Sequence, residues 1–434
     1  MTESDIWALT ELIQEEMQPA LGVTEPGAIA FAVAKARSYL NGEAVHINLS
    51  LSSGIYKNAF TCGIPNSDKV GSLFAAALGF VAGNSEENLK SLSDVTLEDN
   101  KKAQALLDAG MVEANLSGIA ANIFIEAEVT TTEGVCCVTI REKHTNIVKI
   151  VLNGKIIYEH EQAGTEKGIL KNHALIHSFT LRQFCDYADQ VNANDIAFIR
   201  NAYDVNLELF VEGLNSPRTT FAKYLYHMNG NRVISDDELA TAQLLCNAAI
   251  EARVLGLSKP AMSITGSGAH GIICTMPLFA LFQINSLPEE KLLRATSLSY
   301  LITMYIKEYS GRLSAFCGCA IAAGTGMACA LVYLKNGLPE DMKRTVNNMA
   351  SGITGMICDG GNQGCTMKGI VAVDAAFRSV RLAMEGISIA DIHGINGSTP
   401  ESTFRNMGRI ASPGMSGTEK IILEIFKEKM SGSN

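Results

Sequence analysis

Ile123-Phe124-Ile125-Glu126-Ala127-Glu128-Val129 and the following run, Val135 to Arg141, decide the fold class of this chain. Both runs are rich in β-branched residues, which is typical of strands. Two more such runs, 147–152 and 156–158, flank Asn153-Gly154, a strong signal for a hairpin turn. This part of the chain therefore predicts a small β-sheet.

Helical patterns surround the predicted sheet. Before it we expect two helices near the N-terminus, a strand at 46–51, and helices at 69–82 and 98–110. Beyond Leu170 almost every segment reads as helix, interrupted by glycine or proline. The fold class is therefore α+β. A mixed N-terminal α+β domain with a small sheet, 1–165, precedes a larger all-α domain, 166–434, on which the N-terminal helices can also pack.

Composition narrows the class of protein. The chain has 45 acidic and 35 basic side chains, a net charge of -10, which opposes binding to nucleic acid. Its eleven cysteines and the acidic opening Met1 to Asp5 favour a reducing cytoplasm with free or metal-binding thiols. Leu313 to Leu334 is uncharged, but its Ala, Gly, Ser and Cys content favours a buried helix over a membrane span.

Two groups of cysteines carry the chemistry. Cys358 and Cys365 form a C-x6-C pair in a glycine-rich turn, and Cys317-Gly318-Cys319 lies upstream. We expect a helix to end at Cys358 and the next to start just after Cys365, where the helix dipole would lower the thiol pKa. Thiolates in such loops suit soft metals and iron–sulfur clusters, although buried cysteines often only fill space.

Several motifs resemble a known family. They are Cys317-Gly318-Cys319-Ala320-Ile321-Ala322-Ala323-Gly324, Asn348-Met349, Gly355-Met356-Ile357-Cys358-Asp359-Gly360 and Gly364-Cys365. The chain resembles the L-cysteine desulfidase family, which is related to the α chain of the iron–sulfur L-serine dehydratases. That resemblance implies a serine dehydratase alpha-chain-like fold and a [4Fe-4S] cluster. It implies Cys319, Cys358 and Cys365 as ligands, with Cys317 as a rival to Cys319.

The sequence departs from the family where the chemistry should occur. Desulfidases have Gly-Cys-Thr-Glu-Pro, with a proposed catalytic cysteine, where this chain has Gly22-Val23-Thr24-Glu25-Pro26. Valine cannot exchange a proton, so a base must come from another residue. We expect it among His270, Glu25 and Asp359, although a lone histidine among small residues is more often a hydrogen-bonded structural group.

Candidate substrate-binding residues lie in small-residue turns. Ser267 and Gly268 precede an apolar run and could receive a carboxylate at a helix start, or form only a tight turn. Asn58, Asn66 and Ser67 could bind the charged ends of an amino acid, although a helix-capping turn explains 63–69 as well. Lys368 could attract substrate or be a solvated helix residue.

Together these features predict a cytoplasmic iron–sulfur lyase. It would eliminate sulfide or water from L-cysteine, L-serine or a similar small amino acid, giving pyruvate and ammonia. The alternatives are a non-catalytic amino-acid-binding or redox-sensing protein with an altered site, and a cluster-free protein with buried thiols. The expected partner is a small amino acid, with no nucleic acid and no membrane, and a homodimer is left open as the oligomeric state.

Overall fold

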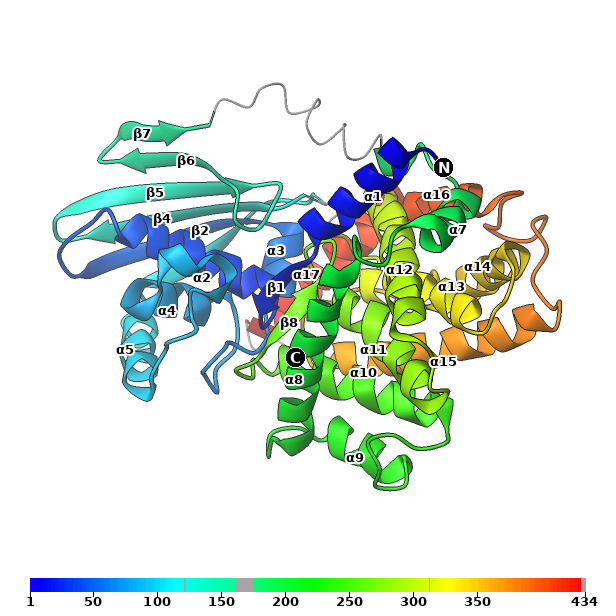
Figure 1. The fold of residues 1–434 in the computed structure, drawn as a ribbon. Coiled ribbons are helices and arrows are strands. Elements are labelled where there is room, and N and C mark those ends of the chain that lie inside the picture. The colour runs from blue at the N-terminus through cyan, green and yellow to red at the C-terminus, as the bar shows by residue number, and fades with distance from the viewer. Residues whose placement is uncertain (121, 161–174, 312, 431–434) are drawn as a thin grey trace.

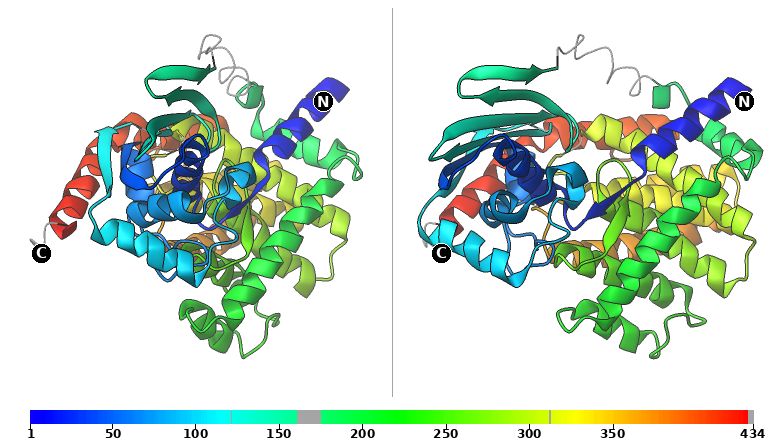
Figure 2. Two further views of the ribbon diagram at one scale, coloured as in Figure 1. Left: turned by 90° about the vertical axis from the view of Figure 1, so that its left-hand side faces the viewer. Right: turned by 60° about the vertical axis from the view of Figure 1, so that its left-hand side comes forward.

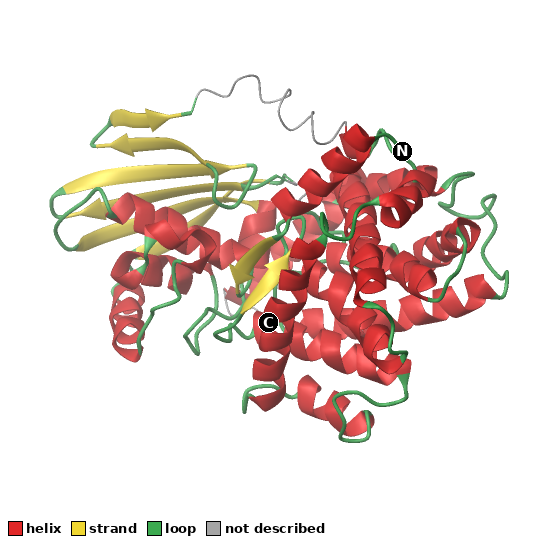
Figure 3. Ribbon diagram, in the orientation of Figure 1, coloured by secondary structure: helices red, strands yellow, loops and turns green. Residues whose placement is uncertain are grey.

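The computed structural model describes residues 1–120, 122–160, 175–311 and 313–430. Strands gather at one end of the molecule and helices form the other (Figure 1, Figure 3). The fold class is the predicted one, a mixed N-terminal region followed by a largely helical region. The predicted domain boundary near residue 165 lies outside the described residues.

The N-terminal region contains a six-stranded sheet. Its strands are β2 (Ala44–Ser52), β3 (Val112–Gly118), β4 (Phe124–Thr131), β5 (Gly134–Arg141), β6 (Ile147–Leu152) and β7 (Lys155–Glu159). Their spatial order is β3-β2-β4-β5-β6-β7, and all neighbours are antiparallel except the parallel pair β2 and β3. Alternation along β4 buries Ile125, Ala127 and Val129 on one face, as a half-buried strand requires.

The N-terminal region also contains helices. They are α1 (Glu3–Glu16), α2 (Thr24–Arg37), α3 (Ser53–Asn58), α4 (Ser72–Ala82) and α5 (Leu97–Asp108), with a 3-10 helix at Ser85–Lys90. The α2 helix packs on β4 and β5 and is itself covered by α4. Almost every α2 residue is buried, because the helix is apolar on all sides and lies between the sheet and α4.

The helical region is built around a buried bundle. Its helices are α7 (Leu181–Gln190), α8 (Arg200–Asn215), α9 (Phe221–Met228), α10 (Glu238–Val254), α11 (Gly268–Ile284), α12 (Glu289–Ser310), α13 (Gly324–Leu334), α14 (Pro339–Ile353), α15 (Gly364–Met384), α16 (Pro400–Arg409) and α17 (Ser416–Met430). Shorter helical segments are the 3-10 helix Ala197–Ile199 and the π-helices Cys319–Ala323 and Ile410–Gly414. The core lies where α10, α11, α12, α13 and α15 pack together.

The two regions are joined by more than one connection. Strand β1 (Gln18–Leu21) pairs antiparallel with β8 (Pro260–Ser263), from Gln18 opposite Ser263 to Leu21 opposite Pro260. The α1 helix packs on α12, and α17 returns to contact α3 in the N-terminal region (Figure 2). The seam between the regions is therefore lined by segments from distant parts of the chain.

Two predicted helix boundaries are wrong. The helix expected to end at Cys358 ends at Ile353, since Met356 to Cys358 runs extended and pairs with residues 315–317. The next helix begins at Gly364, so Cys365 lies in its first turn rather than ahead of it. The segment 313–334 includes a π-helix and α13, and no helix of the described ranges is long and apolar enough to cross a bilayer.

Candidate functional site

The two cysteine segments meet through their backbones. Cys317 N–H donates to Met356 O at 3.1 Å, and Cys358 N–H donates to Ala315 O at 2.6 Å. Phe316 and Ile357 form the antiparallel bridge between these two hydrogen bonds. The segments that carry Cys317 and Cys358 therefore lie side by side, although the sequence separates them widely.

Asn362 shapes the turn that returns the chain to this point. Its Oδ1 accepts from Gly364 N–H at 2.8 Å, and its Nδ2 donates to Asp359 O at 3.2 Å. Cys365 N–H then donates to Asn362 O at 2.9 Å. These bonds start α15 early and place Cys365 Sγ 3.4 Å from Gly360 O. The turn thus keeps both cysteines of the C-x6-C pair at the site.

The thiols and one lysine interact electrostatically. Burial, together with the charges of Cys358 and Cys317, raises the pKa of Cys365 to about 11 against the lowering effect of Lys368. Hydrogen bonding to Cys319, then burial, raises the pKa of Cys317 well above its usual value. Our expectation of a lowered thiol pKa is wrong for Cys365, because burial outweighs the lowering effects of Lys368 and of the backbone hydrogen bond at Asn362.

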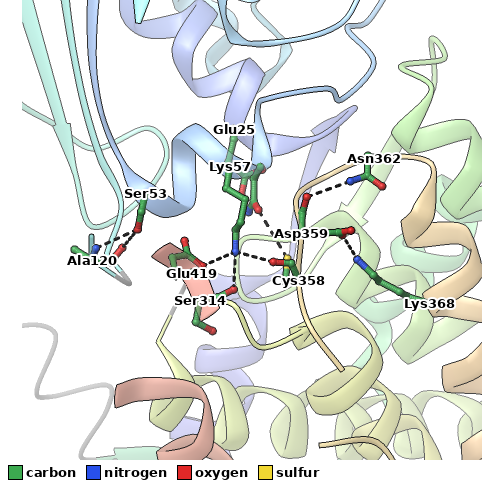
Figure 4. Close-up of polar contacts among 11 residues, drawn as sticks. Glu25, Ser53, Lys57, Ala120, Ser314, Cys358, Asp359, Asn362, Lys368 and Glu419 are labelled. Carbon is green, nitrogen blue, oxygen red and sulfur yellow. Dashed lines mark hydrogen bonds and ion pairs between the residues drawn. The ribbon is translucent and has the colours of Figure 1, made fainter. Parts of the chain in front are cut away.

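Lys368 is the cation of this group. Burial lowers its pKa, but Cys365, the hydrogen bond to Asp359, Cys358 and Cys317 together raise it above the usual value. Its Nζ pairs with the Asp359 carboxylate, so both side chains are held beside the thiols (Figure 4). Lys368 is therefore a partly buried residue of the site rather than a solvated one.

The donor set can be tested against an iron–sulfur cluster. Within the described ranges, no three His, Cys, Asp or Glu side chains converge closely enough to hold one metal ion. An iron–sulfur cluster requires a different arrangement, because each thiolate binds a separate iron around a shared core. Four thiols drawn from two hydrogen-bonded segments fit that arrangement. Cys319, Cys358 and Cys365 are partly exposed, whereas Cys317 is buried.

The N-terminal motif packs directly on the cysteine turn. Gly361 N–H donates to Asn58 O at 3.2 Å, and a Cβ added at Gly361 would lie 2.7 Å from Val23 Cγ1. Val23, where desulfidases have cysteine, is therefore 2% exposed and in contact with the turn between Cys358 and Cys365. Cys358 Sγ lies 3.8 Å from Asn58 Oδ1, so the Asn58 side chain also contacts the cysteine turn.

Glu25 is a buried and hydrogen-bonded carboxylate. Asn58 Nδ2 donates to its Oε1 at 2.9 Å, Thr24 Oγ1 donates to its Oε2 at 3.1 Å, and His144 Nε2 lies 3.8 Å away. Burial raises the pKa of Glu25, but His144, Asn58 and Arg253 outweigh burial and lower it to about 2. Glu25 is thus a fixed negative charge near neutral pH. Thr24 begins α2 rather than capping it, contrary to the usual role of such a threonine.

His270 lies in the first turn of α11, against the other cysteine segment. A Cβ added at Gly318 would lie 2.7 Å from His270 Nε2. The Thr265 hydroxyl donates to Ile264 O, so we assign Nδ1–H of His270 as the donor to Thr265 Oγ1 at 2.6 Å. The lone pair of Nε2 then faces the Cys317–Cys319 segment. Burial, followed by Lys307 and Arg253, lowers the pKa of His270 well below its usual value, so the ring is neutral.

Lys57 is a residue that the sequence did not point to. Its buried Nζ donates to Ser314 O at 3.0 Å, Cys358 O at 2.9 Å and Glu419 Oε2 at 2.8 Å (Figure 4). It therefore links both cysteine segments to α17. No pattern marks it, since a lysine near the end of a short polar helix usually points to water.

The remaining predicted residues divide into two groups. Ser267 precedes α11 without capping it by its side chain, and Gly268 is the first residue of that helix, next to His270. Asn66 Nδ2 instead donates to Leu92 O and Ser93 O, and Ser67 Oγ donates to Asn100 Oδ1. Those bonds fasten the 63–69 turn to α5 and its preceding loop, which satisfies both side chains structurally.

Comparisons with known proteins show which proteins this chain is similar to. The model of the serine dehydratase alpha chain family matches residues 86–424. A UPF0597 protein of Clostridium botulinum is 40% identical over 97% of this chain and 98% of its own length. UPF0597 proteins of Caldanaerobacter subterraneus and Clostridioides difficile are 38% and 32% identical, over 98% and 96% of this chain and 99% of each relative.

Proposed function

Because the chain belongs to the serine dehydratase alpha chain family, we propose that it is an iron–sulfur-dependent lyase. Its substrate would be a small amino acid with a leaving group on the β-carbon, such as L-cysteine or L-serine. Elimination would release sulfide or water and leave an enamine, which takes up one water to give pyruvate and ammonia. The observation that carries the proposal is the pairing of residues 315–317 with 356–358, which brings the segments of Cys317 and Cys358 side by side. The motifs shared with L-cysteine desulfidases support the finer assignment.

Four thiols are available to hold a [4Fe-4S] cluster. Cys319, Cys358 and Cys365 match the family ligands and are partly exposed, and Cys317 remains the rival first ligand. When bound, such a cluster supplies a Lewis-acidic iron for the leaving group. Lys368 adds a positive charge beside the thiols, and this charge favours their anionic form.

His270 is the residue best suited to move a proton. It is neutral, and the Nε2 lone pair lies against Gly318, between the cysteines of the first segment. Glu25 is less suited as a base, because Asn58 and Thr24 already donate hydrogen bonds to its two carboxylate oxygens. Asp359 is engaged with Lys368. In this assignment Glu25 fixes charge and Asp359 orients Lys368, while His270 accepts the α-proton.

One observation favours a second candidate function. Val23 occupies the position of the desulfidase cysteine and contacts Gly361 in the cysteine turn. A protein with this substitution could bind an amino acid, or sense redox state through the thiols, without turnover. The two functions differ in whether bound amino acid is converted to pyruvate.

The test is anaerobic purification, reconstitution with iron and sulfide, iron quantitation, and measurement of pyruvate released from L-cysteine and L-serine. If the protein is a lyase, we expect the wild type to bind iron and to release pyruvate, and we expect Cys365→Ala to do neither. Cys329→Ala is the matched control, because Cys329 is equally a free cysteine but lies buried in α13. Full iron content without pyruvate from any β-substituted amino acid would refute the lyase and leave the binding or sensing function.

A further inference from the structure

Arg253, in the last turn of α10, is a buried cation with an unmatched donor. The residue is 4% exposed. Its Nε is buried and has no hydrogen-bond partner among the residues that the structure describes. A buried guanidinium donor without an acceptor is energetically unfavourable, so a functional role is one explanation for such a group.

The position of Arg253 identifies what it faces. A Cβ added at Gly268 would lie 2.7 Å from Arg253 Nε, so the guanidinium stem lies against the first residue of α11. Its charge also lowers the pKa of both Glu25 and His270, which places it near these two groups. Arg253 is thus adjacent to the residue that we assign as the base.

The N-terminus of α11 adds a second attraction for an anion. This helix has 17 residues, and Ser267 makes no side-chain hydrogen bond to cap it. Uncapped N–H groups and the positive end of the helix dipole favour a carboxylate at this point. Arg253 and Lys307 place two positive charges around His270, with Glu25 as the negative charge and His144 beside it. The two positive charges outnumber the one negative charge, so the electrostatic environment of His270 favours binding of an anionic group.

We propose that Arg253 and the N-terminal turn of α11 bind the α-carboxylate of the amino-acid substrate. The proposal rests on the proposed function and specifies how that site recognises its substrate class. A guanidinium presents paired N–H donors that match the two oxygens of a carboxylate. A carboxylate held beside His270 would also bring the neighbouring α-carbon within reach of Nε2.

The experiment uses reconstituted holoprotein under anaerobic conditions and L-alanine, which carries the carboxylate but no leaving group. Ethylamine, which lacks the carboxylate, is the companion probe. Calorimetric titration of the wild type should show binding of L-alanine and not of ethylamine. Arg253→Gln should weaken L-alanine binding by at least about tenfold, since a charge-assisted hydrogen bond is removed. Arg232→Gln is the matched control, because Arg232 is exposed on a loop.

Arg253→Lys controls for a folding defect in Arg253→Gln. Lysine keeps the positive charge near Glu25 but loses the paired donors of the guanidinium. Arg253→Lys should fold as the wild type does, but it should bind L-alanine more weakly than the wild type. Equal L-alanine affinity in the wild type, Arg253→Gln and Arg253→Lys would overturn the assignment. So would a loss of thermal stability in Arg253→Gln with an unchanged affinity, since Arg253 would then only balance Glu25.

The outcomes separate this inference from the proposed function. A wild type that releases pyruvate while Arg253→Gln keeps the same KM and the same affinity for L-alanine refutes only the role of Arg253. A wild type that carries iron but neither binds L-alanine nor releases pyruvate refutes both. A raised KM together with weaker L-alanine binding in Arg253→Gln supports the carboxylate site.

Discussion

Replacing Lys57 by methionine tests how the site is held together. The ammonium group of Lys57 donates to Ser314 O, Cys358 O and Glu419 Oε2, and its side chain is 0% exposed against 6% for Glu419. Methionine fills a similar volume but cannot donate. Lys57→Met therefore leaves a buried carboxylate without its counter-ion and two carbonyls without a donor.

The size of the effect follows from burial. Removing one partner of a buried ion pair is expected to lower the free energy of unfolding by about 3–5 kcal/mol. Replacing both partners by apolar residues is often nearly neutral, because no unpaired charge remains. The double variant Lys57→Met/Glu419→Leu should therefore recover more than half of the stability lost in Lys57→Met.

Urea unfolding followed by circular dichroism measures these differences. Lys259→Met is the matched control, because Lys259 pairs with Glu208 on the surface and should barely change the unfolding midpoint. Lys57→Met should also retain less iron after reconstitution, since Cys358 O loses its donor. The reasoning fails if Lys57→Met is as stable as the wild type, or if the double variant is no more stable than the single one.

Three further predictions concern the buried charge of Glu25, the valine at position 23 and the choice between Cys317 and Cys319 as first cluster ligand. Glu25, whose pKa is lowered to about 2, adds stability above its usual pKa near 4.5 that is lost as the pH falls toward 2. Acid titration of stability should show a loss on the order of 3 kcal/mol over this window in the wild type and a flatter profile in Glu25→Gln; identical profiles contradict the assignment. Val23→Cys should raise pyruvate release with unchanged iron content, because it places a thiol against the cysteine turn, and an unchanged rate argues against a chemical role at this position. Cys319→Ala should lose iron while Cys317→Ala keeps it, and the reverse result would make Cys317 the first ligand.

Local patterns predicted most elements of the fold. The alternation at 123–129 and the Asn153-Gly154 turn produce β4 and the β6–β7 hairpin, because both signals act over a few residues. The short strands β1 and β8 were missed, since their pairing joins residues about 240 apart and leaves no local period. The start of α15 was also missed, because it depends on the Asn362 side chain accepting from Gly364 N–H.

The candidate site was predicted only in part, for a related reason. Cysteine spacing and family motifs pointed to Cys317, Cys319, Cys358 and Cys365, and the structure places the two segments side by side. Lys57 and Arg253 gave no signal, because their importance comes from burial against distant segments. A sequence pattern reports residue type and local spacing, whereas burial of a charge depends on the whole fold.

The β1–β8 ladder limits how a ligand could reach the candidate site. It fastens Gln18 to Ser263 and Leu21 to Pro260, immediately before Val23 on one strand and the His270 turn on the other. Separating the N-terminal region from the helical region would break the β1–β8 hydrogen bonds and the Lys57–Glu419 ion pair at the same time. Access to the site is therefore expected through small adjustments of side chains and turns around it, which would restrict its ligands to compact molecules.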